Sequence, residues 1–252
     1  MSSQTARSLT REPFRQILGI KFFTGSAAEA VDRMSTGGLL VVPSAPALKD
    51  LPSNLSYREA LLNADLTITD SAFMVLIWNI LQRDRIQRTS GLAYLRELLQ
   101  RQDIRQTGAF WVMAGASSAL RNVRWLRSIG INVAPEDIYL APQYKDEIAD
   151  EALLKLLRER RPHHIVLTLG GGTQEPLGFY LKRNLDFHPA IHCIGAAIAF
   201  LTGDQVRIPE WADRFYVGWL FRCLAQPRRF VSRYWRARKL LPLMLRYRGN
   251  LP

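Results

Sequence analysis

Short apolar runs alternate along the chain with segments whose apolar residues have helical spacing. The runs are rich in β-branched and aliphatic residues, which is typical of buried strands. Predicted strands lie at residues 14–23, 39–42, 66–69, 110–113, 165–169 and 191–194, with an edge strand at 131–138. Predicted helices lie at residues 26–36, 57–63, 73–81, 91–101 and 150–161, and another ends at residue 128. Because strands that alternate with helices form parallel sheets, the pattern predicts an α/β fold, a Rossmann-like, mainly parallel sheet with helices on both faces.

The composition changes near residues 203–209, which divides the chain into two predicted parts. Residues 1–204 are expected to form the α/β core. Residues 205–252 are expected to form a basic, aromatic appendage of two or three helices, broken at Pro227 and Pro242. With 252 residues the chain is long enough to bury a full core, and it contains no internal repeat.

The net charge of +12 is concentrated in the predicted appendage. Residues 207–252 contain ten arginines and one lysine against Glu210 and Asp213, and the cations are interleaved with aromatic side chains. This pattern suits an anionic membrane surface, to which basic and aromatic side chains both contribute binding. It also suits nucleic acid, or a basic helix that faces solvent.

Cysteine and histidine usage argues against several classes of protein. Two cysteines, Cys193 and Cys223, are too few for a disulfide scaffold and favour a reducing cytoplasm. None of the four histidines is paired along the sequence with a carboxylate or a cysteine at metal-ligand spacing, so no metal site is expected. No apolar run approaches the roughly 18 to 20 residues that span a bilayer, and the N-terminus lacks the apolar core of a signal peptide.

A glycine-rich turn after the predicted strand 165–169 is the first candidate binding site. The strand is followed by Gly170, Gly171, Gly172, Thr173, Gln174 and Glu175. Ligands bind at the carboxyl ends of strands in open α/β sheets, and glycines there let backbone N–H groups approach an anion closely. The alternative interpretation is a tight turn with a polar rim.

Asp70 is the best candidate for a catalytic group. It stands at the carboxyl end of the predicted strand 66–69, directly before an apolar helix. A carboxylate in this position can act as a general base toward a hydroxyl. It can also be the N-cap of the following helix, which spacing alone favours.

Two further strand ends carry small residues. Residues 114–118 read Ala-Gly-Ala-Ser-Ser between a strand and a helix, which is the usual anion-binding arrangement. The segment includes Gly115 but lacks a complete G-x-G-x-x-G, so support for a dinucleotide is weak and no cofactor is expected. Gly195 lies in a similar turn after residues 191–194.

Seven segments carry motifs whose order along the chain matches a known pattern. They are Thr69-Asp70-Ser71 before a helix with Trp78, Arg88-Thr89-Ser90-Gly91-Leu92, Met113-Ala114-Gly115, Thr168 through Glu175, Arg207-Ile208-Pro209-Glu210-Trp211, Trp219 to Arg222, and Gln226-Pro227-Arg228-Arg229. In order and type they resemble the WecG/TagA/CpsF glycosyltransferases, glycosyltransferase family 26, over about residues 15–245.

The resemblance implies a metal-independent, inverting transfer of a sugar from a UDP-sugar to a polyprenyl-diphosphate-linked saccharide acceptor. Such an enzyme would lie on the cytoplasmic face of the membrane and serve bacterial cell-surface polysaccharide biosynthesis. The general base would be Asp70. Substrate would be bound by Thr69, Ser71, Arg88, Gly115, Tyr144, Gly170, Gly171, Gly172, Thr173, Gln174, Glu175, Gly195, Arg207, Arg222, Arg228 and Arg229. Basic residues further along the chain are expected to contact the lipid surface. They are Arg233, Arg236, Arg238, Lys239, Arg246 and Arg248.

The chain departs from the family pattern at four places. Pro43-Ser44-Ala45 stands where the family has Thr-Pro-Asn, and the segment ending at Ala199 lacks the family's acid. Gln143 replaces the glycine before Tyr144, and Gly218 replaces a glutamate. The departures are compatible with an altered donor, and also with an inactive relative that serves as an assembly subunit, with homo-oligomers possible. A basic nucleic-acid-binding protein is the other alternative, although the resemblance implies no nucleic-acid partner.

Overall fold

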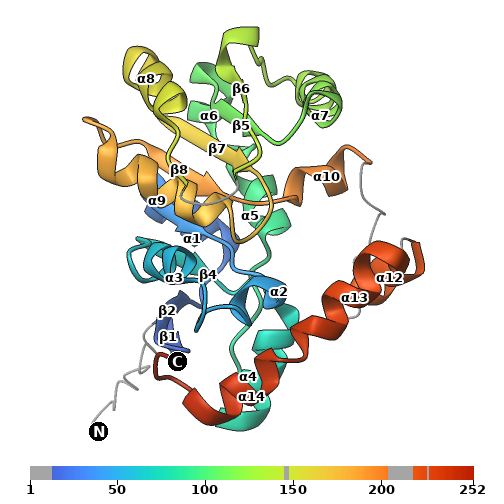
Figure 1. The fold of residues 1–252 in the computed structure, drawn as a ribbon. Helices are drawn as coiled ribbons and strands as arrows, with labels where there is room; N and C mark the ends of the chain where they lie inside the picture. Colours follow the sequence, from blue (N-terminus) through green and yellow to red (C-terminus); the bar gives the residue numbers. More distant parts are fainter. Residues whose placement is uncertain (1–12, 145–147, 204–217, 226) are drawn as a thin grey trace, which may run out of the picture.

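The computed structural model describes residues 13–144, 148–203, 218–225 and 227–252, and its centre is an eight-stranded sheet (Figure 1). The strands are β1 (Phe14–Ile17), β2 (Ile20–Phe23), β3 (Gly38–Val41), β4 (Leu66–Ile68), β5 (Phe110–Met113), β6 (Ile138–Leu140), β7 (His164–Thr168) and β8 (Ala190–Cys193). Their order across the sheet is β1-β2-β4-β3-β8-β7-β5-β6. Among the described strands only the β1–β2 pair is antiparallel, which confirms the predicted α/β class with a mainly parallel sheet.

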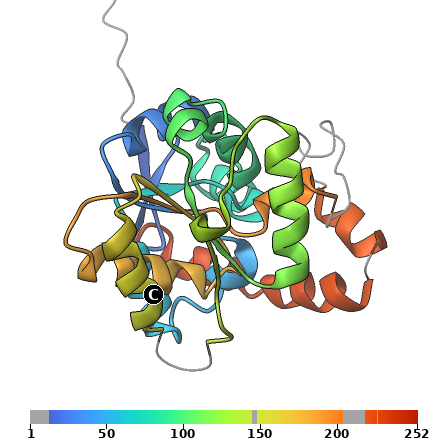
Figure 2. The same ribbon diagram turned by 90° about the horizontal axis from the view of Figure 1, so that it is seen from above.

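Helices cover both faces of the sheet. They are α1 (Ala27–Met34), α2 (Ala45–Leu48), α3 (Leu55–Leu62), α4 (Ala72–Gln82), α5 (Gly91–Leu98), α6 (Gln102–Thr107), α7 (Ala116–Ser128), α8 (Glu151–Arg160), α9 (Gln174–Asn184) and α10 (Ala197–Leu201), followed by α12 (Gly218–Ala225), α13 (Pro227–Ala237) and α14 (Leu240–Tyr247). Buried side chains of α2, α3, α4, α8, α9 and α14 form one core cluster, and those of α1, α5, α6, α7 and α10 form the other. Figure 2 shows α8 and α9 on one side of the sheet and α5 and α6 on the other.

Two predicted strands differ from the structure. The run at residues 14–23 is a hairpin, because Leu18 (φ 51°) and Gly19 (φ 77°) both adopt the left-handed conformation that a two-residue turn requires. In the segment 131–138 only Ile138 belongs to a strand, β6. The apolar residues Ile131 and Val133 are buried in the core, and Pro135 then begins a single 3-10 turn.

The C-terminal helices run along one side of the molecule and return to the sheet (Figure 1). Pro227 and Pro242 lie in the first turns of α13 and α14, where a missing N–H costs little, so α14 is not broken at Pro242 as predicted. The side chains of Leu240 and Met244 in α14 are fully buried in the same core as the sheet. Leu18 N–H also donates to the carbonyl of Arg248 at 2.7 Å. The C-terminal end of the chain is therefore tied to the core, while the expected boundary at 204/205 begins a stretch outside the described residues.

None of the described helices combines the length and the apolar character that a transmembrane span needs.

Candidate active site

The carboxyl ends of five neighbouring strands enclose a cavity of about 920 Å³. It is lined by Val42 and Ser44 after β3, Asp70 after β4, Ala114 after β5, the segment 168–171 at the end of β7, and the segment 195–199 after β8. Helices α5, α7, α10 and α13 complete the walls. This is the edge of an open α/β sheet at which ligands bind.

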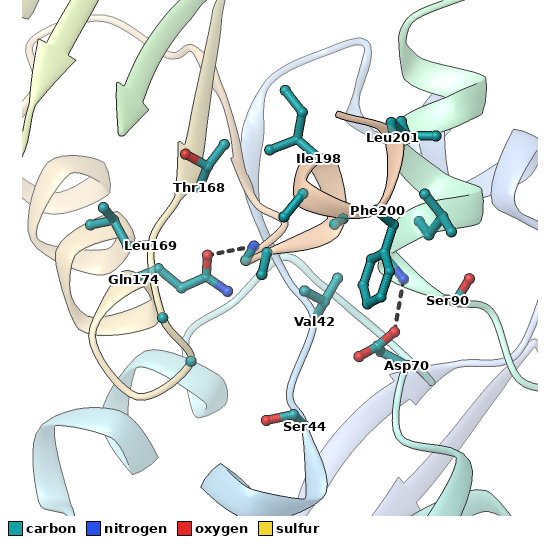
Figure 3. Close-up of a pocket in the computed structure, with 18 of the residues that line it drawn as sticks. Val42, Ser44, Asp70, Ser90, Thr168, Leu169, Gln174, Ile198, Phe200 and Leu201 are labelled. Carbon is teal, nitrogen blue, oxygen red and sulfur yellow. Dashed lines mark hydrogen bonds between the residues drawn. The ribbon is translucent and has the colours of Figure 1, made fainter. Parts of the chain in front are cut away.

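The Asp70 carboxylate lines this cavity. It is held in place by α5, not by α4, the helix that it precedes. Its Oδ1 accepts a hydrogen bond from Gly91 N–H, at the start of α5, at 2.9 Å (Figure 3). The guanidinium of Arg88 lies 3.7 Å from the same oxygen and also donates to the Asp70 carbonyl at 2.6 Å. Among the described residues, no group donates to Oδ2. One carboxylate oxygen is therefore anchored and the other is available to a ligand.

The N-cap of α4 is Ser71, not Asp70, so the capping alternative for Asp70 is wrong. The Ser71 hydroxyl accepts from Met74 N–H at 3.2 Å, which satisfies one of the unpaired donors of the first turn. The neighbouring Thr69 is fully buried, and its hydroxyl donates to the Gln87 carbonyl at 2.8 Å. These two hydroxyls hold the segment around Asp70 in place and do not line the cavity.

The glycine turn after β7 leaves open space beside its backbone. Gly170 and Gly171 line the cavity, and Gly172 has a φ of +92°, which only glycine adopts readily. A Cβ atom added to Gly170 or Gly172 would meet no other atom within 4 Å. At Gly170, which also lines the cavity, packing therefore leaves the backbone accessible, as a ligand that approaches N–H groups requires. Thr173, next in sequence, makes no side-chain hydrogen bond to cap α9.

Gln174 and Glu175 join the turns that follow β7 and β8. The Gln174 amide oxygen accepts from Gly195 N–H at 2.7 Å (Figure 3), and its amide nitrogen donates to the Cys193 carbonyl at 3.2 Å. The Glu175 carboxylate accepts from Gly172 N–H at 2.7 Å and from the Gln174 amide at 3.2 Å. Both side chains are buried and fix the shape of two cavity walls; Gln174 also lines the cavity, whereas Glu175 does not.

Burial raises the pKa of Glu175 to about 7 from its usual 4.5. Between these two values the folded protein holds a proton that the unfolded chain has released, so the free energy of unfolding should fall as pH rises. The expected loss is about 3 kcal/mol from pH 4.5 to about 7. We expect urea unfolding of Glu175→Gln to lack this loss, whereas Glu59→Gln, at an exposed carboxylate, should keep it. Parallel profiles for wild type and Glu175→Gln would contradict the prediction.

Positive charge in the cavity comes largely from arginines that sequence reasoning did not select. Arg88 was expected, but Arg96 of α5, Arg121 of α7 and Arg233 of α13 also line the cavity. Arg233 had been assigned to the lipid surface. Arg228 is exposed and lies outside the lining, Arg207 lies outside the described residues, and the side chains of Arg222 and Arg229 are also outside what the structure describes.

Gly115 and Tyr144, two other predicted binding residues, lie outside the lining as well. Gly115 is the N-cap of α7, and Tyr144 donates its hydroxyl to Asp150, the N-cap of α8, at 2.6 Å. By contrast, Asn122 and Trp125 of α7 and Phe200 of α10 line the cavity and were missed. The sequence did carry a signal for Asn122 and Trp125, because α7, the helix on which they lie, begins at the predicted anion-binding loop.

Comparison with known proteins decides the relationship. The family model "Glycosyl transferase WecG/TagA/CpsF family" matches residues 15–251. The chain belongs to this family. One relative is the N-acetylglucosaminyldiphosphoundecaprenol N-acetyl-β-D-mannosaminyltransferase of Bacillus spizizenii (strain ATCC 23059 / NRRL B-14472 / W23). It is 23% identical over 199 residues, which cover 77% of this chain and 74% of the relative.

Two departures of this WecG/TagA/CpsF member fall in the cavity wall. Ser44 lines the cavity, and its buried hydroxyl has no hydrogen-bond partner among the described residues. Ala199, which stands in place of the family's acid, lies in the wall formed by α10. The differences from the family therefore change surfaces that a substrate would contact. Gln143 lies outside the lining, and the exposure of Gly218 is outside what the structure describes.

A histidine cluster lies at the opposite end of β7 from the cavity. The His164 ring contacts the Asp103 carboxylate at 3.2 Å. It also contacts the rings of His163 at 2.9 Å and His192 at 3.1 Å. His192 in turn contacts the Tyr94 hydroxyl at 2.8 Å. Burial lowers the pKa of His164 and, more strongly, that of His192, which favours neutral rings. The sequence expectation concerned metal-ligand spacing along the chain; in space, folding brings Asp103 to His164 across 61 residues of sequence.

Proposed function

We propose that the protein transfers a sugar from a UDP-sugar to a polyprenyl-diphosphate-linked saccharide, with inversion and without a metal. The observation that carries the proposal is the Asp70 carboxylate, held by Gly91 N–H at the floor of a large cavity that also contains four arginines. A fixed base beside concentrated positive charge suits the attack of a hydroxyl on a sugar whose leaving group is a diphosphate.

In the proposed step, Oδ2 of Asp70 accepts the proton of the acceptor hydroxyl. The hydroxyl oxygen attacks the anomeric carbon of the donor sugar, the bond from that carbon to the diphosphate breaks, and UDP leaves with the electron pair. Attack from the face opposite UDP inverts the anomeric configuration. Anchoring of Oδ1 supports this role because a base held in one orientation needs no reorganisation during the reaction.

In this proposal, arginine side chains neutralise the negative charge of the leaving diphosphate. Arg88, Arg96, Arg121 and Arg233 line the cavity, and guanidinium groups match phosphate oxygens with paired donors. Asp70 is the only carboxylate among the described lining residues, so the described part of the cavity offers no pair of acids to hold a divalent cation. Both points favour a metal-independent reaction.

A second cavity of about 320 Å³ shares Gly170, Gly171 and Arg233 with the first. It adds Lys49 and Arg236, so it is also positively charged. The proposed reaction involves two diphosphates, one on the donor and one on the acceptor lipid. We assign the larger cavity to the UDP-sugar and the smaller to the acceptor diphosphate.

The first donor to test is a UDP-N-acetylhexosamine, because the relative from Bacillus spizizenii is named for transfer of an N-acetylmannosaminyl group. The departures at Ser44 and Ala199 make the donor preference the least transferable part of the comparison. We place the protein on the cytoplasmic face of a bacterial membrane, peripherally bound, where the polyprenyl-linked acceptor is available.

The direct test incubates purified full-length protein with a panel of UDP-sugars and a synthetic polyprenyl-diphosphate N-acetylglucosamine, with and without a chelator. We expect one donor to yield a lipid-linked disaccharide, at the same rate after chelation. A protein that binds the lipid but neither a UDP-sugar nor UDP, without turnover across the panel, would favour the assembly-subunit alternative. Tight, salt-sensitive binding of nucleic acid without UDP binding would favour the other alternative.

A further inference from the structure

Helix α4 is apolar on nearly all sides, yet one of its faces is open to solvent. Met74, Val75 and Trp78 face the core. On the other side Phe73, Leu76 and Ile80 are 37%, 45% and 68% exposed. Exposed faces of surface helices are normally polar, so a row of large apolar side chains at helical spacing indicates a surface that another phase or partner covers.

Helix α14 packs beside α4 and repeats the pattern. Its Leu240 and Met244 are buried, whereas Leu241 and Leu245, one helical turn apart, are 41% and 51% exposed. Figure 1 shows the two helices side by side at one end of the molecule. We call the exposed residues of both helices the α4–α14 apolar face. They are Phe73, Leu76, Ile80, Leu241 and Leu245.

Cations, and few acids, accompany this face. Neither α4 nor α14 contains an aspartate or a glutamate. The exposed cations at the ends of the two helices are Arg83, Arg85, Arg246 and Arg248. The nearby acid Asp84 is paired with Arg15 at 2.7 Å. Apolar side chains flanked by cations are the composition of helices that lie in the interface of an anionic bilayer.

We propose that the α4–α14 apolar face inserts into the interfacial layer of an anionic membrane. A second copy of the chain is the other possible occupant, but a two-fold interface would bring the same arginines of both copies together without compensating acids. Anionic lipid headgroups neutralise those arginines instead. The membrane contact then involves an internal helix of the α/β core as well as the basic C-terminal segment.

The location of α4 gives this contact a consequence for the site. Asp70 lies two residues before α4 begins, so a membrane-bound α4 brings the proposed base close to the bilayer surface. The acceptor sugar is joined to a lipid through a diphosphate in the function proposed above, on which this consequence rests. Such an acceptor can reach Asp70 only if the cavity opens close to the headgroups.

The test is co-sedimentation of the full-length protein with vesicles of phosphatidylglycerol and phosphatidylcholine in equal parts. We expect Leu76→Ser/Ile80→Ser to reduce the vesicle partition coefficient about tenfold or more, because two inserted aliphatic side chains are lost. The matched control is Leu55→Ser/Leu62→Ser, two exposed leucines on α3, which should bind as wild type does. Point variants are preferable to truncation, since removal of α14 would take Leu240 and Met244 from the core.

Sedimentation without a sugar donor separates this proposal from the proposed reaction. With activity established, Leu76→Ser/Ile80→Ser should lose turnover on a vesicle-embedded acceptor and keep it on a short-chain, water-soluble one. Thermal unfolding identifies any variant that fails to fold, and Ile80→Ser alone, at the most exposed position, then replaces the double variant. Wild-type binding by the folded variant, equal loss in the α3 control, or a wild-type dimer that this variant dissociates would each overturn the proposal.

Discussion

Replacement of Asp70 by asparagine is expected to lower turnover by about 100-fold or more while leaving the fold intact. The amide oxygen of asparagine can still accept the hydrogen bond from Gly91 N–H, so the start of α5 should remain anchored. What the substitution removes is the capacity of the second oxygen to take a proton. The measurement is kcat with an established donor and acceptor.

Two controls make the Asp70 result interpretable. UDP binding should stay near its wild-type affinity in Asp70→Asn, since the proposed base does not contact the leaving group. Asp70→Ala should lose activity as well, and it should also lower the thermal midpoint because Gly91 N–H loses its partner. Near-wild-type turnover in a folded Asp70→Asn would remove Asp70 as the base.

The second large effect is expected at Arg88, which lines the cavity and contacts Asp70. Arg88→Ala should reduce kcat/KM by about 100-fold or more, the size seen when a donor that stabilises developing charge is lost. Arg88→Lys keeps the charge but not the paired donors, so activity should recover only in part.

Arg85 provides a matched control, because it is an exposed arginine in the same loop and lies outside the cavity lining. Arg85→Ala should leave kcat/KM unchanged with a soluble acceptor. If Arg88 contacts the leaving diphosphate, the loss of kcat/KM in Arg88→Ala should differ from one sugar donor to another. The variant should also bind UDP more weakly than the wild type does. A loss in kcat with unchanged UDP affinity would show that Arg88 acts only by positioning Asp70.

Local sequence pattern was enough to locate most of the strands and the edge of the sheet that carries the cavity. Buried parallel strands read as continuous apolar runs, and β3, β4, β5, β7 and β8 all lie within predicted runs or at their margins. Asp70 and the glycines that follow β7 stand directly after such runs. Their place at the cavity therefore follows from the general geometry of parallel sheets.

Patterns failed where a residue's role depends on a partner distant in sequence. Capping by Asp70 was the natural expectation from spacing, but its carboxylate instead reaches Gly91, 21 residues further on. The hairpin at Leu18-Gly19 was missed because Leu18 is an unusual residue for a left-handed turn position. The histidines were judged only by their sequence neighbours, whereas Asp103 approaches them through the packing of α6 against the sheet.

The sequence by itself determined the fold class, the family motifs and the strand ends at which Asp70 and the glycine turn lie, because these depend on local periodicity and on residues adjacent in the chain. Only the tertiary structure decided which cations share the cavity with Asp70. Arg96, Arg121 and Arg233 come from three different helices, and no local pattern distinguishes them from the other arginines of a chain with net charge +12. The packing of those helices around the strand ends selects them.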